Sequence, residues 1–206
     1  MLKKNVLSCL RATSSVLRIV TGVFAIYLFV FPYMPEIMYA VNPPPPPPLP
    51  DAAVFDILPE EFLQATKKGE SRIYIPKSEV SNVEIIEADN INQVHEKVWR
   101  FPTTSSPDKG SNTVMLGHRY RTLGGEAEST FYHLPKLVPG DKIYVAWENN
   151  LYVYIVDETE TVPPSKVSIL NPTELPILTI YTCTPLWSAT DRFVVKSSLL
   201  TVISFV

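Results

Sequence analysis

The sequence predicts a mainly β protein, an eight-stranded barrel with short helices, preceded by one N-terminal transmembrane helix. From Ser71 onward, short apolar runs typical of strands alternate with turn signals, and little helical periodicity lies between them. About eight such runs follow one another without an internal repeat, and they cover roughly 130 residues, which fits a closed or nearly closed barrel. A chain of 206 residues therefore carries one domain with appendages.

The individual elements follow in order along the chain. A helical turn or two is expected over residues 131–137, a turn at 148–150, and a connection or edge at 162–170, which contains two prolines. The apolar tail from Leu199 either extends the last strand or simply ends the chain. The runs predicted as strands are residues 72–77, 83–86, 98–102, 113–116, 142–147, 151–156, 178–182 and 193–195.

The N-terminal segment is predicted to anchor the chain in a membrane. Four basic residues and no acidic ones precede Glu36, whereas the remainder carries 14 basic and 21 acidic residues. Residues 19–35 have no charge, and the chain stays apolar from there through Val41 except for Glu36. This is at the short end for a span, which needs roughly 20 apolar residues. The positive-inside rule places the N-terminus in the cytoplasm and the rest of the chain outside.

Two alternatives to an uncleaved anchor stay open. One is a signal peptide cleaved near residues 38–40, and the other is a buried helix of a soluble protein. The apolar run is longer than an ordinary signal-peptide core, which favours the anchor. A basic end on an otherwise acidic chain does not indicate nucleic-acid binding, because that needs a basic face on the folded domain.

A proline-rich stretch follows the apolar segment. Residues 43–48 are six consecutive prolines, which favour an extended polyproline II helix of about 3.1 Å per residue. This stretch is either a stiff spacer or a ligand for a proline-binding module, and outside the cell the spacer is favoured. Residues 52–68 fit an amphipathic helix interrupted at Pro59, which either packs on the domain edge or belongs to the stalk.

The predicted organisation has three parts. Residues 1–41 form a cytoplasmic basic stub and the membrane anchor. Residues 42–70 form a proline-rich stalk with a short helix. Residues 71–206 form the β-barrel, on the outer side of the membrane.

Residues 178–195 carry the candidate chemistry. Their apolar first part reads as a buried strand that leads to Cys183, and a loop over residues 184–191 leads to Arg192 at the start of the next strand. If these strands are antiparallel neighbours, the thiol and the guanidinium point into one space. A neighbouring cation lowers the pKa of a thiol and stabilises an oxyanion, which are the needs of a cysteine nucleophile. The alternative is an inert, small hydrophobic side chain.

The histidines supply the candidate acid or base. His118 follows a predicted buried strand and Gly117, which places it at a strand end. His95 lies in a polar stretch and is expected to be solvated, and His133 lies among apolar residues and is expected to pack or to cap. Cys9 lies on the opposite side of the predicted membrane from Cys183, so the two do not pair. No spacing of potential ligands predicts a metal site, and no glycine-rich phosphate loop is present.

These segments resemble the sortases, the membrane-anchored cysteine transpeptidases of bacterial surfaces. The resemblance runs from about Arg72 to Leu200, and Ile180 replaces the leucine of the family's TLxTC motif. The strings that carry it occur in the family's order and spacing: RIYIPK, WRFP, SNTVMLGHR, FYHLPKLVPGDKIYV, TIYTC and DRFVV. The family's fold is the predicted eight-stranded β-barrel.

The resemblance implies a role for each candidate residue. It makes Cys183 the nucleophile that forms a thioacyl enzyme, His118 the acid and base, and Arg192 the group that stabilises the transition state. Thr182 is implied as an additional substrate or oxyanion contact. No cofactor is implied.

The resemblance also implies the substrates and partners. Sortases cleave secreted proteins after the threonine of a C-terminal Leu-Pro-x-Thr-Gly-type signal and transfer them to an amine of the cell wall or of a pilin. The sortase subclass stays open. Trp187 is expected either to contact substrate or to pack on the barrel rim. A calcium requirement is open too, because family calcium sites use scattered carboxylates and Asp89, Asp108 and Glu126 are available.

Two other functions remain to be separated from a transpeptidase. A cysteine endopeptidase would pass the acyl group to water instead of an amine. A non-catalytic, membrane-tethered β-barrel would display a binding surface and would hold the Cys183 thiol buried and unreactive.

Overall fold

The structure is a computed structural model of the chain. It divides the chain into two compact units, Met1–Pro43 and Pro44–Val206. The polyproline stretch from residue 45, the first part of the expected helix over 52–68, and His95 lie outside the described residues. The residues that the structure describes are 17–44, 57–88, 96–123, 126–128 and 130–205.

The first unit is helical but interrupted. A helix over Leu17–Val30 is followed by the short 3-10 helix η1 (Phe31–Tyr33) and by α2 (Met34–Val41). A proline lies in the first turn of both η1 and α2, and proline breaks a helix because it removes a donor and clashes with the preceding turn. Among the described residues no single helix is long and apolar enough to span a membrane. Leu17–Val30 and Met34–Val41 meet that test together, with a bend of 66° between them. The single transmembrane helix stays a prediction.

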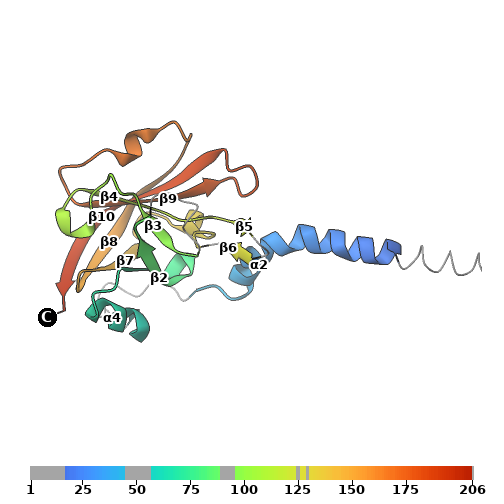
Figure 1. Cartoon of the computed structure of the whole chain (residues 1–206), viewed down its shortest axis with the longest axis horizontal. Helices are drawn as coiled ribbons and strands as arrows, with labels where there is room; N and C mark the ends of the chain where they lie inside the picture. Colours follow the sequence, from blue (N-terminus) through green and yellow to red (C-terminus); the bar gives the residue numbers. More distant parts are fainter. Residues whose placement is uncertain (1–16, 45–56, 89–95, 124–125, 129, 206) are drawn as a thin grey trace, which may run out of the picture. The chain divides into compact units, whose positions relative to one another are not determined.

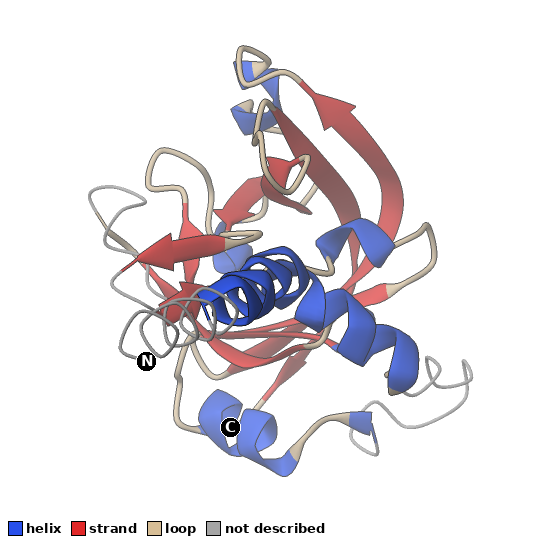
Figure 2. Cartoon of the chain, turned by 90° about the vertical axis from the view of Figure 1, so that its right-hand side faces the viewer, coloured by secondary structure: helices blue, strands red, loops and turns tan. Residues whose placement is uncertain are grey.

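The second unit is a closed barrel of eight strands, which confirms the predicted fold (Figures 1 and 2). Around the barrel the strands follow the order β1-β2-β3-β4-β9-β10-β8-β7, and β7 pairs with β1 to close it. All pairs are antiparallel except β2 with β3 and β4 with β9. The strands are β1 (Arg72–Ile75), β2 (Val80–Ile86), β3 (Val98–Arg100), β4 (Asn112–Leu116), β7 (Lys142–Trp147), β8 (Asn150–Val162), β9 (Ile177–Thr184) and β10 (Asp191–Ser204).

Several elements differ in extent from the prediction. β8 has 13 residues and β10 has 14, so β8 runs on to the start of the predicted connection and the apolar tail extends the last strand. Their ladder persists past two register shifts, which mark bulges in a long, twisted pair. A two-stranded sheet of β5 (Arg121–Leu123) and β6 (Glu126–Glu128) was not predicted, because these short polar runs lack a strand's apolar alternation.

In the described part of the helix expected over residues 52–68, Ile57 is helical, the helix is interrupted at Pro59 as expected, and α4 (Glu60–Lys67) follows with Pro59 at its N-cap. Proline is well tolerated at a helix start and poorly tolerated inside one, which explains this boundary. Phe62 and Leu63 pack on Tyr144 and other residues of β7 and β8, so of the two alternatives the helix packs on the barrel (Figure 1). Truncation of a buried phenylalanine such as Phe62 costs about 3–5 kcal/mol.

Alternation along β7 shows why both faces of this strand are buried. Ile143 and Val145 point into the barrel core, whereas Tyr144 and Ala146 face α4. The barrel interior is therefore filled by side chains, and no side chain of this core is available for chemistry. The candidate residues instead lie where β4 and β9 end.

Three 3-10 turns complete the connections that matter for the site. η2 (Pro76–Ser78) joins β1 to β2, and η5 (Leu134–Lys136) lies in the predicted helical region after His118. η6 (Val167–Leu170) lies between β8 and β9. Figure 2 shows such short helical segments in the connections between strands.

Candidate active site

Cys183 and Arg192 are direct partners in the antiparallel ladder between β9 and β10. Side chains of directly opposed residues share one face of a sheet, with Cβ atoms about 4.5–5.5 Å apart. Both residues are half-buried, and Cys183 is a free thiol. The expected antiparallel pairing of the two strands is confirmed, and it places both side chains on one face of the sheet.

The loop between β9 and β10 holds the Arg192 guanidinium through its backbone. Nη1 of Arg192 donates to the carbonyl oxygens of Ala189 at 3.2 Å and Asp191 at 3.0 Å. Ala189 has a φ of 49°, a left-handed conformation that costs a non-glycine residue roughly 1–2 kcal/mol. None of the ion pairs among described residues involves Arg192. The guanidinium is thus oriented by neutral carbonyls, and its charge is not neutralised by a carboxylate there.

Tyr181 lies two residues before Cys183 and therefore on the same face of β9. Burial raises the pKa of Tyr181 to about 12, with the Arg192 cation opposing this rise and Cys183 adding to it. The phenol therefore stays neutral at physiological pH. It packs beside Leu116 and Val194, which makes the surroundings of the thiol on this face apolar.

The register of β4 and β9 brings His118 to Cys183. The two strands are parallel, and their last pair is Leu116 with Tyr181. His118 and Cys183 each lie two residues beyond this pair. The Thr182 hydroxyl donates to the Gly117 carbonyl at 2.9 Å, so the two segments remain side by side after the ladder ends. His118 is half-buried.

Gly117 is required by a close approach. A Cβ at this position would lie 2.9 Å from Cδ2 of Phe131, a distance that real Cβ atoms essentially never show. Phe131 is fully buried, and its amide donates to the His118 carbonyl at 2.9 Å. The backbone around His118 is therefore fixed from two sides, by β9 and by the segment that leads to η5.

Thr182 lies on the opposite face of β9 from Cys183, because adjacent residues of a strand alternate. It is 1% exposed, and its hydroxyl binds the Gly117 carbonyl. The implied substrate or oxyanion contact of Thr182 stays a prediction. The structure gives its hydroxyl an internal partner next to His118.

Aromatic side chains connect the loops on the outer side of the site. The rings of Trp187 and Tyr120 meet edge to face with centroids 5.7 Å apart, and Tyr120 meets Tyr132 at 6.4 Å. Trp187 is 57% exposed. The expected packing of Trp187 is thus observed as its contact with Tyr120, and a contact of Trp187 with substrate stays a prediction.

His133 and Asp108, two of the other candidate residues, lie in the 3-10 turns η5 and η4 (Pro107–Lys109) or at their ends. His133 is buried, its Nδ1 lies 2.9 Å from Glu79 Oε2, and it occupies the N-cap position of η5, which confirms its packing role. Asp108 is exposed in η4, and Asp89 lies outside the described residues. Within the described part of the chain no three His, Cys, Asp or Glu side chains are grouped to hold a metal ion.

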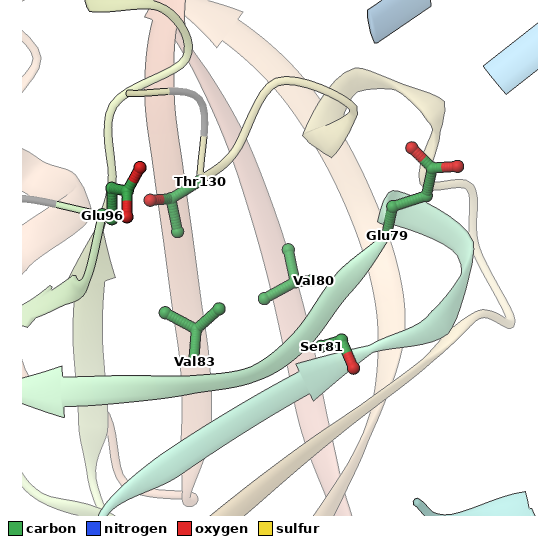
Figure 3. Close-up of a pocket in the computed structure, with 6 residues that line it drawn as sticks. All are labelled: Glu79, Val80, Ser81, Val83, Glu96 and Thr130. Carbon is green, nitrogen blue, oxygen red and sulfur yellow. The ribbon is translucent and has the colours of Figure 1, made fainter. Parts of the chain in front are cut away.

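A pocket of about 250 Å³ opens next to the segment that follows His118. Figure 3 shows Glu96 and Thr130 on one side of it, Glu79 on the other, and Val80 and Val83 between them. Thr130 directly precedes Phe131, whose amide binds the His118 carbonyl. The Glu79 carboxylate is paired with His133, so Glu96 is the remaining acidic group of the lining.

Comparison with known proteins agrees with this geometry. A family model described as the sortase domain matches residues 73–200, which is more than half of the chain. This chain belongs to the sortase family. The match covers every barrel strand except the first residue of β1 and the end of β10, and it includes Cys183, His118 and Arg192.

Individual sortases show how far the similarity extends. Sortase A of Listeria monocytogenes is 34% identical over 88 residues, a stretch that spans 43% of this chain and only 38% of that protein. The crystal structure of Listeria monocytogenes sortase A matches with a TM-score of 0.58 and 26% identity, over 66% of this chain and 90% of that chain. A Clostridium perfringens sortase D5 transpeptidase matches with a TM-score of 0.55 and 27% identity, over 70% and 91% of the two chains.

A hydrogen bond between two polar neighbours of this candidate site was not predicted from the sequence. Arg119 and Thr184 directly follow His118 and Cys183, and Nη1 of Arg119 donates to Oγ1 of Thr184 at 2.8 Å. The strings GHR and TCT place them beside the candidate residues. Only the parallel pairing of β4 with β9 shows that they meet.

Proposed function

We propose that this protein is a cysteine transpeptidase that cleaves a C-terminal sorting signal of the Leu-Pro-x-Thr-Gly type and transfers the acyl part to an amine. Sortase family membership supports the reaction class. The catalytic roles are assigned because three segments, which carry Cys183, Arg192 and His118, lie at one end of β9. Cys183 opposes Arg192 across one ladder, and the register of a second ladder brings His118 to the same strand end.

The first half of the reaction forms a thioacyl enzyme. The Cys183 thiolate attacks the carbonyl carbon of the Thr-Gly bond and gives a tetrahedral oxyanion. The Arg192 guanidinium donates hydrogen bonds to this oxygen, and a backbone amide beside Cys183 adds a second donor. When the C–N bond breaks, the His118 imidazolium gives its proton to the leaving amine. The acyl group is then joined to Sγ of Cys183.

The second half transfers the acyl group to the acceptor. The incoming amine attacks the thioester carbonyl carbon, and neutral His118 takes a proton from it. The C–S bond then breaks, which returns the Cys183 thiolate and leaves a new amide bond. The net result is one amide bond broken and one formed, so neither an oxidant nor a cofactor is needed.

The surroundings of Cys183 favour a reactive, catalytic thiol rather than an inert, structural one. A purely structural cysteine would be expected in the barrel core, among the fully buried side chains. Cys183 is instead half-buried at a strand end, on the face that carries Arg192. The apolar neighbours Tyr181 and Val194 limit water near the thiol, which strengthens the interaction of Arg192 with an oxyanion.

The same proposal includes the placement of the protein at the cell surface. Residues 1–41 hold it in the bacterial cell membrane with the N-terminus in the cytoplasm, and the prolines from residue 43 separate the barrel from the membrane. Support comes from the four basic residues before the apolar segment and from the sortase family itself. The partners are secreted proteins that bear a sorting signal and an amine of the cell wall or of a pilin.

The two cysteines provide a direct test of this topology. A membrane-impermeant maleimide added to intact cells that produce the protein is expected to label Cys183 and to spare Cys9. Labelling of Cys9 in intact cells, or labelling of Cys183 only after lysis, would contradict the proposed orientation.

Product analysis separates transfer from hydrolysis. Full-length protein in detergent is incubated with Leu-Pro-x-Thr-Gly peptide variants, with and without a glycine-type amine. A transpeptidase gives the ligated product in the presence of the amine, and Cys183→Ala and His118→Ala abolish it. Hydrolysed peptide alone, at every amine concentration, would identify a cysteine endopeptidase.

A further inference from the structure

Arg119 and Thr184 form a side-chain bridge immediately beyond the candidate catalytic pair. Nη1 of Arg119 donates to Oγ1 of Thr184 at 2.8 Å, although the two residues lie 65 positions apart in the sequence. Arg119 follows His118 and Thr184 follows Cys183. Both side chains are half-buried, so water competes with this bond less than it would at the surface.

We propose that Arg119 and Thr184 are positioning residues, and that their bridge holds His118 in the position beside Cys183 from which it exchanges protons with the leaving and incoming amines. This inference rests on the proposed function, because that function assigns the reacting groups. Neither Arg119 nor Thr184 is assigned a chemical step.

The need for such a bridge follows from where the β4–β9 ladder ends. Its last pair is Leu116 with Tyr181, so the ladder stops before His118. Beyond it, side-chain contacts join the segments. The Thr182 hydroxyl holds Gly117 on one side of His118, and the Arg119–Thr184 bridge closes the other side. His118 therefore lies on a short segment that is attached to β9 at both of its ends.

The magnitude of the expected effect comes from the geometry of proton transfer. A general acid acts through a hydrogen bond of about 2.6–3.2 Å. A displacement of about 1 Å in an active site reduces the rate on the order of 100-fold. Loss of the bridge leaves the Thr182–Gly117 bond and the Phe131 amide to hold the segment around His118. We therefore expect a displacement of up to this size without unfolding of the barrel, because the core strands are unaffected.

The two residues permit conservative tests. Thr184→Val keeps the shape and removes the acceptor, which leaves the Arg119 donor without this partner. Thr184→Ser keeps the hydroxyl, and Arg119→Met keeps much of the length without a donor. Thr190→Val is a matched control, because Thr190 lies in the same loop and its hydroxyl makes an exposed hydrogen bond to the Asp191 side chain.

Two readouts on the full-length protein in detergent test the bridge. The first is kcat and KM for transfer of a Leu-Pro-x-Thr-Gly peptide to a glycine-type amine. The second is the rate of Cys183 alkylation by iodoacetamide between pH 5 and 10, compared with that of His118→Ala. If His118 lies close enough to interact with the thiol, its removal changes the alkylation profile of Cys183.

We expect Thr184→Val and Arg119→Met each to lower kcat about 10- to 100-fold with little change in KM. Both shift the alkylation profile toward that of His118→Ala. The double variant is no slower than the slower single variant, because both changes break one interaction. Thr184→Ser and Thr190→Val behave like the wild type.

Wild-type kcat in both single variants, or strictly multiplicative losses in the double variant, would overturn the proposal. A loss caused by misfolding is recognised by a lowered Tm and by failure of Thr184→Ser to restore the rate. If the wild-type protein transfers no peptide at all, the proposed function fails instead. The alkylation profiles still decide whether the bridge couples His118 to Cys183.

Discussion

Leu116 and Tyr181 face each other as the last pair of the parallel ladder between β4 and β9. This pairing joins two parts of the chain that are 65 residues apart, and it determines which residues emerge together at the strand ends. Two positions further along, the emerging residues are His118 and Cys183. The candidate active site is therefore a consequence of strand register in the barrel.

Replacement of Arg192 tests the proposed stabilisation of the oxyanion. Lysine keeps the charge but lacks the planar fork of donors and the bonds of Nη1 to the loop carbonyls. We expect Arg192→Lys to lower kcat for peptide transfer roughly 100- to 1,000-fold, the effect of losing an oxyanion donor. Lys196→Arg, on the same strand but paired with Glu158, is the control and should remain active. A wild-type rate in Arg192→Lys would remove Arg192 from the mechanism.

Gly117→Ala tests the close packing behind His118. The new Cβ would lie 2.9 Å from the Phe131 ring, so we expect a loss of about 1–3 kcal/mol in the free energy of unfolding. Phe131→Leu removes part of the clash, and the double variant should lose less stability than the sum of the single variants. Chemical denaturation of all four proteins measures this coupling. Additive losses would show that the Gly117 contact with Phe131 does not limit the packing.

The hydroxyl of Tyr144 provides a stability prediction that is independent of the site. It is buried and has no hydrogen-bond partner among the described residues, and an unpaired buried polar group costs about 1–3 kcal/mol. We expect Tyr144→Phe to be at least as stable as the wild type at pH 7. A clear loss of stability in denaturant unfolding would contradict this reading of the contact with α4.

The same residue makes an alkaline prediction. Burial, with a smaller contribution from Tyr74, raises the pKa of Tyr144 to about 12. The folded-state pKa is thus above the unfolded value of about 10. The stability linked to this shift is therefore fully present below pH 10 and is lost as the pH rises toward 12. Between pH 10 and 12 the wild type should lose more stability than Tyr144→Phe. Parallel losses in the two proteins would contradict the prediction.

Acid should locally destabilise the connection between β8 and β9, which Lys166 joins to Glu160 of β8 through an ion pair. The hydrogen bond from Lys166, opposed by burial and reinforced by Lys196, lowers the pKa of Glu160 from its ordinary value of 4.5. A lowered folded-state pKa gives stability above about pH 4.5 that is lost as the pH falls. Hydrogen exchange of the amides of Val167–Leu170, corrected for intrinsic rates, should therefore accelerate below pH 4.5.

Replacement of Lys166 tests whether its ion pair with Glu160 causes this acid response. In Lys166→Met the exchange should already be fast at pH 7 and should change little on acidification. Glu174→Gln, in the same connection, serves as the control and should keep the wild-type pH dependence. An acid response that persists in Lys166→Met would show that another group causes the faster exchange.

Local sequence signals predicted most of the barrel but not its ends. Apolar runs such as residues 142–147 and 113–116 coincide with β7 and β4 within a residue, because their side chains are buried on one or both faces. β8 and β10 run past their apolar parts, since there they are stabilised by pairing with each other and by ion pairs such as Lys196 with Glu158. The β5–β6 sheet has no apolar signal at all.

The site could be predicted in part for a similar reason. Cys183 and Arg192 flank one loop, so antiparallel pairing of consecutive strands was enough to bring them together. The Arg119–Thr184 bridge depends on a parallel pairing between distant strands, which no local pattern encodes. The inward position of Thr182 follows from alternation once Cys183 is placed on the outer face.

Mass spectrometry of Cys183 during turnover tests the central claim most directly. Full-length protein is mixed with Leu-Pro-x-Thr-Gly peptide variants without an amine, quenched in acid and digested. The proposed function predicts a thioester-linked acyl fragment on the peptide that contains Cys183, lost on addition of a glycine-type amine and absent from Cys183→Ala. An unmodified Cys183 with every peptide, together with a thiol that resists alkylation in the folded protein, would contradict a cysteine transpeptidase.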